Sequence, residues 1–193
     1  MSTDSKADLP PTRERILMAT LDLIGRDGIG AVTNRQVAAT AGVALGSLTY
    51  HFPNQVDLLR ESLAYYSDRE VERISGLAEY VRRKGLTAEE VTVQAEAAIA
   101  AFAQGPAQLA VMELYLQAWR DPEVRSAAVA AIAAYDDLAT AFLDALGVAD
   151  PERHAPAVVA MFYGLAIRRV AIGDAAVEGT AQALMLLVRG AAN

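Results

Sequence analysis

The chain has 193 residues, of which 53% are hydrophobic and 21% are charged, so it can bury a substantial core and is not a disordered chain. It contains no cysteine, which excludes disulfides and thiolate metal sites. The net charge is −7, yet residues 1–60 hold six basic and six acidic residues, so a neutral N-terminal part is followed by an acidic body.

The pattern of apolar residues predicts a helical protein. Apolar side chains recur at steps of three and four residues, so the expected fold class is all-α, with about nine helices. The most apolar segment, residues 155–173, carries Arg168 and Arg169, which argues against a membrane span. The N-terminus lacks the apolar stretch of a secretory signal, so we expect a cytoplasmic protein without a membrane anchor.

A tail and one helix are expected first. Residues 1–11 are polar, contain two prolines and are predicted to be a disordered tail. Thr12 is a candidate N-cap for a helix that ends near Gly28 and has one apolar face, which includes Ile16 and Leu23. This helix should brace the segment that follows it.

The segment from Thr33 to Phe52 has the pattern of two short helices joined by a tight turn. Thr33 and Gln36 have the spacing of a capping box, and Gly42 can end the first helix without a Cβ penalty. Leu48 should point inward from the second helix. The outward side of that helix carries hydrogen-bonding groups, namely Ser47, Thr49, Tyr50 and His51. This arrangement predicts a helix-turn-helix that binds DNA.

A long helix should connect this segment to the rest of the chain. Asn54 and Asp57 are its expected cap, Val56 and Leu59 begin its expected buried face, and it should end near Arg83. Helices are then expected at about residues 87–102, 107–120, 122–146, 152–172 and 177–190.

These residues resemble the TetR family of bacterial transcriptional regulators. The resemblance covers Thr12 to about Leu59 and includes VTNRQVAATAGVALGSLTYHFPNQVDLL, which begins at Val32. The family's positions in it are Gly42, Val43, Gly46, Leu48, His51 and Phe52. The resemblance implies a DNA-binding domain at residues 12–53 and a ligand-binding and dimerisation domain at residues 54–193. It also implies a homodimer in which the last two helices of each chain pair.

The same resemblance implies contacts with double-stranded DNA. Thr33 and Arg35 should meet phosphates. Base edges should face Leu45, Gly46 and Ser47, and the DNA backbone should lie beside Thr49, Tyr50 and His51. Departures from the family pattern occur at Ala44, Leu45, Thr49 and Gln55, the last of which stands where a phosphate-binding lysine is usual. We therefore expect weaker attraction to the DNA backbone.

Large apolar and amphipathic residues of the body predict an effector pocket. Several combine an apolar body with a polar tip, as small-molecule pockets require. Such residues at helical spacing also make up a plain core, so both interpretations stay open. The residues concerned are Phe102, Met112, Tyr115, Trp119, Tyr135, Phe142 and Phe162.

A stripe of small residues predicts the dimer interface. Ala160, Gly164 and Ala171 share one face of the helix expected at residues 152–172. Glycine inside a helix costs ~1 kcal/mol relative to alanine, which a close approach of another helix would offset. The interface of four helices would be completed by Val158, Phe162, Leu165, Leu184 and Leu187.

Together these features predict a ligand-responsive repressor that binds an inverted-repeat operator as a dimer and is released by a small, largely apolar effector. A helical scaffold protein would explain the body but not the outward polar groups of residues 45–51. An enzyme is disfavoured, because acids such as Glu90 and Asp136 accompany no nucleophile elbow or phosphate loop, and no cofactor is expected. His51 and His154 are too far apart in the sequence to predict a metal site.

Overall fold

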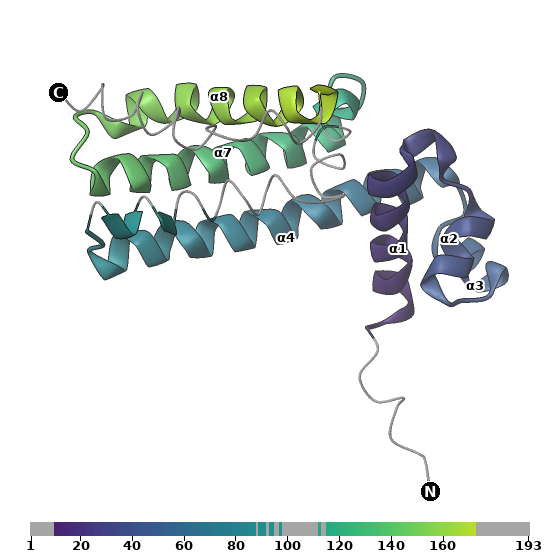
Figure 1. Ribbon diagram of the computed structural model, residues 1–193. Coiled ribbons are helices and arrows are strands. Elements are labelled where there is room, and N and C mark those ends of the chain that lie inside the picture. Colours follow the sequence, from purple (N-terminus) through teal and green to yellow (C-terminus); the bar gives the residue numbers. More distant parts are fainter. Residues whose placement is uncertain are drawn as a thin grey trace, which may run out of the picture.

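The protein is all-α in the computed structural model, which describes residues 10–87, 89–91, 93–94, 97, 112 and 115–172. Its helices are α1 (Thr12–Asp27), the 3-10 helix η1 (Ile29–Ala31), α2 (Asn34–Ala41), α3 (Leu45–His51), α4 (Gln55–Lys84), α7 (Pro122–Ala145) and α8 (Pro151–Ile172). These residues form no strand. A small head of α1, α2 and α3 lies at one end of α4, α7 lies along the rest of that helix, and α8 lies on the other side of α7 (Figure 1). The predicted fold class is confirmed, whereas the helix at residues 177–190 lies outside the described residues.

The head has its own apolar core. Leu48 of α3 and Ile16 of α1 are fully buried in it, and Phe52 is 1% exposed. The remaining buried members of this head core are Leu17, Ala19, Leu23, Ile24, Val32, Val37, Ala38 and Leu58. Because α3 has only seven residues and no side-chain cap at Ala44, its stability depends on these contacts rather than on its own hydrogen bonds.

The turn between α2 and α3 forms as the sequence predicts. The hydroxyl of Thr33 accepts a hydrogen bond from the backbone N–H of Gln36 at 3.3 Å and donates one to its side-chain oxygen at 2.7 Å. Gly42 adopts a left-handed conformation, with φ of 64°. Arg15 of α1 adds a contact that sequence spacing did not reveal: its guanidinium donates to the carbonyl oxygens of Ala41 and Gly42, each at 2.8 Å. The end of α2 is thereby fixed against α1.

Two local predictions are wrong. Thr12 is the first residue of α1 rather than its cap, because Pro11 occupies the capping position. Val56 is 63% exposed, whereas Leu58 is fully buried. Residues two apart on a helix point to nearly opposite sides, so the cap at Asn54 directs Leu58, not Val56, into the head core.

The long helix α4 belongs to both parts of the molecule. Asn54 caps it by accepting a hydrogen bond from the backbone N–H of Asp57 at 2.8 Å, as predicted. Its 30 residues span about 45 Å. Near the head, the carboxylate of Glu14 accepts hydrogen bonds from the Tyr65 hydroxyl at 2.5 Å and the Arg69 guanidinium at 3.0 Å. These contacts fasten α1 to α4.

Within the body, α4 packs on α7 and α7 packs on α8 (Figure 1). The hydroxyl of Ser67 donates to the carbonyl of Ala127 at 2.8 Å, so the backbones of α4 and α7 approach closely there. The buried side chains of the body core are Ile74, Ala78, Val81, Ala134, Tyr135, Leu138, Ala139, Ala141, Leu143, Val148, Ala155, Val159 and Ala166. By length and composition residues 124–145 would pass for a membrane span, with a mean hydropathy of 1.3, but the core helix of a soluble protein passes the same test.

Candidate DNA-binding and effector sites

The outward face of α3 carries the residues predicted to read DNA. Gly46 and Thr49 are exposed, Leu45 is 47% exposed and Tyr50 is 83% exposed, while Ser47 is half-buried. These side chains come from a helix that is anchored on its other side by the buried Leu48. In Figure 1, α2 and α3 lie at the end of the molecule away from α8. The structure therefore brings the predicted base-reading residues onto one accessible surface.

The start of α2 supplies a second part of this surface. Thr33 and Arg35 are both exposed there. The first N–H groups of a helix have no partners within the helix, and its dipole favours an anion, so this end is suited to a phosphate. An exposed guanidinium adds a charge-assisted donor.

Three side chains at this surface are already engaged with the protein. The hydroxyl of Thr49 donates to the carbonyl oxygens of Leu45 and Gly46, at 3.3 and 3.1 Å. The ring of the half-buried His51 lies edge-on to that of Tyr50, with centroids 5.3 Å apart. The side-chain amide of Gln55 donates to the carbonyl of Val32, so it links α4 to the loop before α2. This contact gives Gln55 a structural role where the family pattern has a cation.

Gly46 provides a test of whether the exposed face meets DNA. A Cβ at this position would meet no heavy atom of the protein within 4 Å. Since alanine is favoured over glycine in a helix by roughly 0.5–1 kcal/mol, Gly46→Ala should keep or slightly raise the unfolding temperature. We expect it to weaken DNA binding, because the methyl group would stand between the helix and the bases. A mobility-shift titration checks this, with Gly76→Ala on α4 as a control that should leave DNA affinity unchanged.

Most of the predicted effector residues come together in the body. Tyr135 is 7% exposed and belongs to the body core, against which Met112, Tyr115, Phe142 and Phe162 pack while partly buried. Trp119 does not join them and its assignment is wrong: it follows the helical residues 115–118 in a turn, and it is 84% exposed. Phe102 lies outside the described residues.

A polar group that the sequence analysis missed lies among these residues. Glu70 of α4 is only 8% exposed. Arg73 donates to both of its carboxylate oxygens, at 2.7 and 3.0 Å, and the hydroxyl of Tyr135 donates to one of them. Next to them, the Tyr115 and Tyr163 hydroxyls are 2.6 Å apart. The sequence signal that could have revealed this cluster is the acid Glu70, which shares one face of α4 with the buried Ser67 and Ile74.

The cluster shifts the proton affinities of its members. Burial raises the pKa of Glu70, but the hydrogen bonds from Arg73 and Tyr135 and the charge of Arg73 lower it by more, so this pKa lies below its usual range and the group is ionised at neutral pH. Burial, followed by the negative charge of Glu70, raises the pKa of Tyr66 and of Tyr135. The four tyrosines, Tyr66, Tyr115, Tyr135 and Tyr163, therefore act as neutral hydroxyls around one carboxylate.

The small residues predicted to form the dimer interface lie exposed on α8. Ala160, Gly164 and Ala171 are exposed, and Ile167 between them is 56% exposed. Phe162 has its ring 6.1 Å from that of Tyr135 and packs against the body core while partly buried, so its place in the dimer interface stays a prediction. Val158 and Leu165 are half-buried, and Leu184 and Leu187 lie outside the described residues.

A helix-turn-helix head on a helical body defines a class of DNA-binding regulators, and comparison with known proteins identifies the family. The family described as bacterial regulatory proteins, tetR family, matches residues 16–62. The tetracyclin repressor-like C-terminal domain matches residues 82–190. The chain belongs to the TetR family of transcriptional regulators, which are not enzymes.

Individual relatives agree with this assignment. The transcriptional repressor KstR of Rhodococcus jostii is 50% identical over 62 residues, which are 32% of this chain and 27% of KstR, so the similarity to it spans about a quarter of that protein. A protein from Streptomyces coelicolor described as a transcriptional regulator is 29% identical over 95% of this chain and all of its own, with a TM-score of 0.64. The multidrug binding protein EbrR, in complex with ethidium, is 26% identical over 92% of this chain and 98% of its own, with a TM-score of 0.63.

Proposed function

We propose that the protein is a cytoplasmic repressor that binds an inverted-repeat operator as a homodimer. The observation that carries this proposal is the exposed face of α3, which is held outward by the fully buried Leu48. Two such heads, related by the two-fold axis of a dimer, would read two half-sites of opposite orientation. The exposed small residues of α8 would supply the contact between the two chains.

A small, largely apolar effector in the body would release the protein from DNA. The half-buried aromatic residues around Tyr135 are suited to such a molecule, and the similar protein EbrR binds ethidium. The dimer would have one conformation that fits the operator and one that does not, and the effector must bind the second more tightly. A coupling free energy of ~1 to 3 kcal/mol would change operator affinity about 5- to 150-fold.

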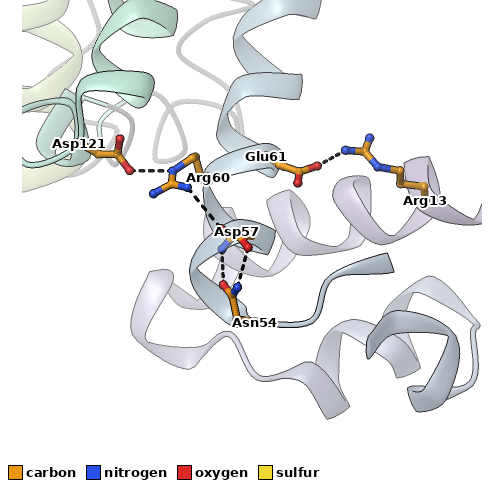
Figure 2. Close-up of polar contacts among 6 residues, drawn as sticks. All are labelled: Arg13, Asn54, Asp57, Arg60, Glu61 and Asp121. Atoms are coloured by element: carbon orange, nitrogen blue, oxygen red, sulfur yellow. Dashed lines mark hydrogen bonds and ion pairs between the residues drawn. The ribbon is translucent and has the colours of Figure 1, made fainter. Parts of the chain in front are cut away.

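Arg60 gives the body a direct connection to the head. Its Nε donates to the carboxylate of Asp121, just before α7, at 2.8 Å, and its Nη1 to Asp57 at 3.3 Å. Asp57 is in turn bonded to the capping residue Asn54 (Figure 2). A movement of the start of α7 would therefore act on the first turn of α4, next to the recognition helix.

Operator binding tests the proposal. Arg35→Ala should weaken binding to every sequence and reduce the slope of affinity against salt concentration by about one unit, because one phosphate contact is lost. Ser47→Ala should instead change the preference at one position of each half-site, by ~1 to 3 kcal/mol. Mobility-shift titrations over a range of salt concentrations separate the two effects. The control is Arg83→Ala, which removes an exposed arginine at the far end of α4.

Two outcomes would contradict the proposal. A footprint over a single asymmetric site would contradict operator binding by a symmetric dimer. Failure to shift any palindromic fragment next to the protein's own gene would favour a helical scaffold protein instead.

A further inference from the structure

The presence of the charged residue Glu70 in the body core is not explained by a gain in folding stability. Removing Glu70 from water has a large desolvation cost, and apolar residues of similar volume stabilise a core as well as a buried ion pair or better. Its neighbours Ile74 and Ala78 on α4 are almost completely buried. The buried carboxylate of Glu70 is therefore a candidate binding group.

The side chains around Glu70 are those that bind an organic cation. The rings of Tyr115, Tyr135, Phe162 and Tyr163 form a continuous aromatic group, with neighbouring centroids 5.3 to 6.1 Å apart. Aromatic faces attract cations, and the attraction increases when water is excluded. Tyr115, Phe162 and Tyr163 are only partly buried, so these residues keep some accessible surface.

Arg73 shows that a cation fits against this carboxylate. Its guanidinium binds both oxygens of Glu70, yet 46% of its side chain is exposed, compared with 10% of the side chain of Glu70. Arg73 can therefore move into water, whereas Glu70 cannot. An entering cation could take the place of the guanidinium without leaving the buried carboxylate unpaired.

A second acid adds to the negative character of the cluster. Asp136 follows Tyr135 in α7, and its buried Oδ1 has no hydrogen-bond partner among the described residues. Burial raises the pKa of Tyr115, and the negative charges of Glu70 and Asp136 raise it further, as expected for two carboxylates near one ring. With Arg73 displaced, the described residues of the cluster would offer the carboxylates of Glu70 and Asp136 to an entering cation.

We propose that the effector is an organic cation whose charged group replaces Arg73 on Glu70, among the rings of Tyr115, Tyr135 and Tyr163. This proposal rests on the proposed function of the body as an effector site and specifies the chemical class of the effector. The ion pair between Arg73 and Glu70 closes the site when the effector is absent. The effector is thus largely apolar but positively charged.

Two probes of the same size and shape and of opposite charge test the charge requirement. The full-length protein should bind tetraphenylphosphonium, measured by isothermal titration calorimetry, and should not bind tetraphenylborate. Glu70→Gln keeps the shape of the side chain but removes its charge, and should weaken phosphonium binding about tenfold or more. Glu72→Gln is the matched control, because Glu72 lies on the same helix but is exposed, and its affinity should equal that of the wild type.

Arg73→Gln gives an independent test, because tighter phosphonium binding is not expected if Glu70 only stabilises the fold. It removes the internal competitor, so phosphonium should bind about threefold more tightly or better. This variant decides the matter if Glu70→Gln does not fold, as judged by circular dichroism. The proposal would be overturned if the wild type bound no phosphonium or bound the borate equally well. It would also be overturned if folded Glu70→Gln kept its affinity for phosphonium, or if Arg73→Gln bound phosphonium more weakly.

Operator binding distinguishes this inference from the function on which it rests. A wild-type protein that shifts its operator but binds no phosphonium would retain the DNA-binding function and lose the cation assignment. A protein that binds phosphonium but no DNA would lose the function and retain the cation site.

Discussion

Replacing Leu48 by alanine is expected to unfold the head while the body stays folded. Leu48 is fully buried, and truncating such a side chain typically costs ~2 to 5 kcal/mol. That is a large part of the stability of a small domain, which totals only ~5 to 15 kcal/mol. The seven-residue α3 has no side-chain cap to offset the loss. Operator binding should therefore disappear, since the DNA-reading face depends on this helix.

Hydrogen exchange measured along the chain would detect this selective loss. Protection should fall in residues 12–53 and persist in α7. Leu45→Ala is the matched control, since it changes the same residue type on the same helix at a position that is 47% exposed. It should leave protection intact and change only operator affinity. Equal loss of protection in α7 and in the head would contradict a separately anchored head.

Gly164→Leu is expected to convert the dimer into monomers and to abolish operator binding. Gly164 is exposed in the single chain, and an added Cβ would meet no heavy atom within 4 Å, so the fold of one chain should tolerate the larger residue. Two helices that approach closely at this glycine could not accommodate two leucines. A monomer reads one half-site and loses the gain from binding both together. Sedimentation equilibrium and a mobility-shift assay measure the two effects.

Gly76→Leu controls for the introduction of leucine in place of an exposed helical glycine. Gly76 lies on α4, and its added Cβ would also meet no heavy atom within 4 Å. This variant should remain dimeric and bind its operator normally. A dimer that persists in Gly164→Leu would show that the exposed stripe of α8 is not the interface.

The features that sequence analysis predicted correctly are mostly local. The caps of α2 and α4 involve residues three apart, as in Thr33 with Gln36 and Asn54 with Asp57, so their geometry follows from spacing. Gly42 is similar, because the left-handed conformation that ends α2 favours glycine. The exposed face of α3 followed from helical periodicity together with one buried leucine.

The features that the sequence did not reveal depend on contacts between distant segments. Glu70 and Tyr135 are 65 residues apart, and only the packing of α4 on α7 brings them together. The assignment of Trp119 to the effector site failed for a related reason. Apolar character does not show whether a large residue faces its own chain, a second chain or solvent. By its periodicity Phe162 could belong to either proposed site, and in the single chain it packs against the body core.

The contacts of Glu14 with Tyr65 and Arg69 determine how DNA specificity could be transferred between regulators. A chimera joined at Pro53 would separate Glu14 from both partners and would give the transplanted head a foreign supporting helix. The transferable unit is therefore longer than the DNA-binding domain and should extend to Arg69. Because that unit contains Arg60, the recipient body also needs an acid at the position of Asp121. To transfer operator preference, the whole head and the first half of α4 must therefore be moved, and the recipient must carry an acid to pair with Arg60. Transfer of the recognition helix alone should not suffice.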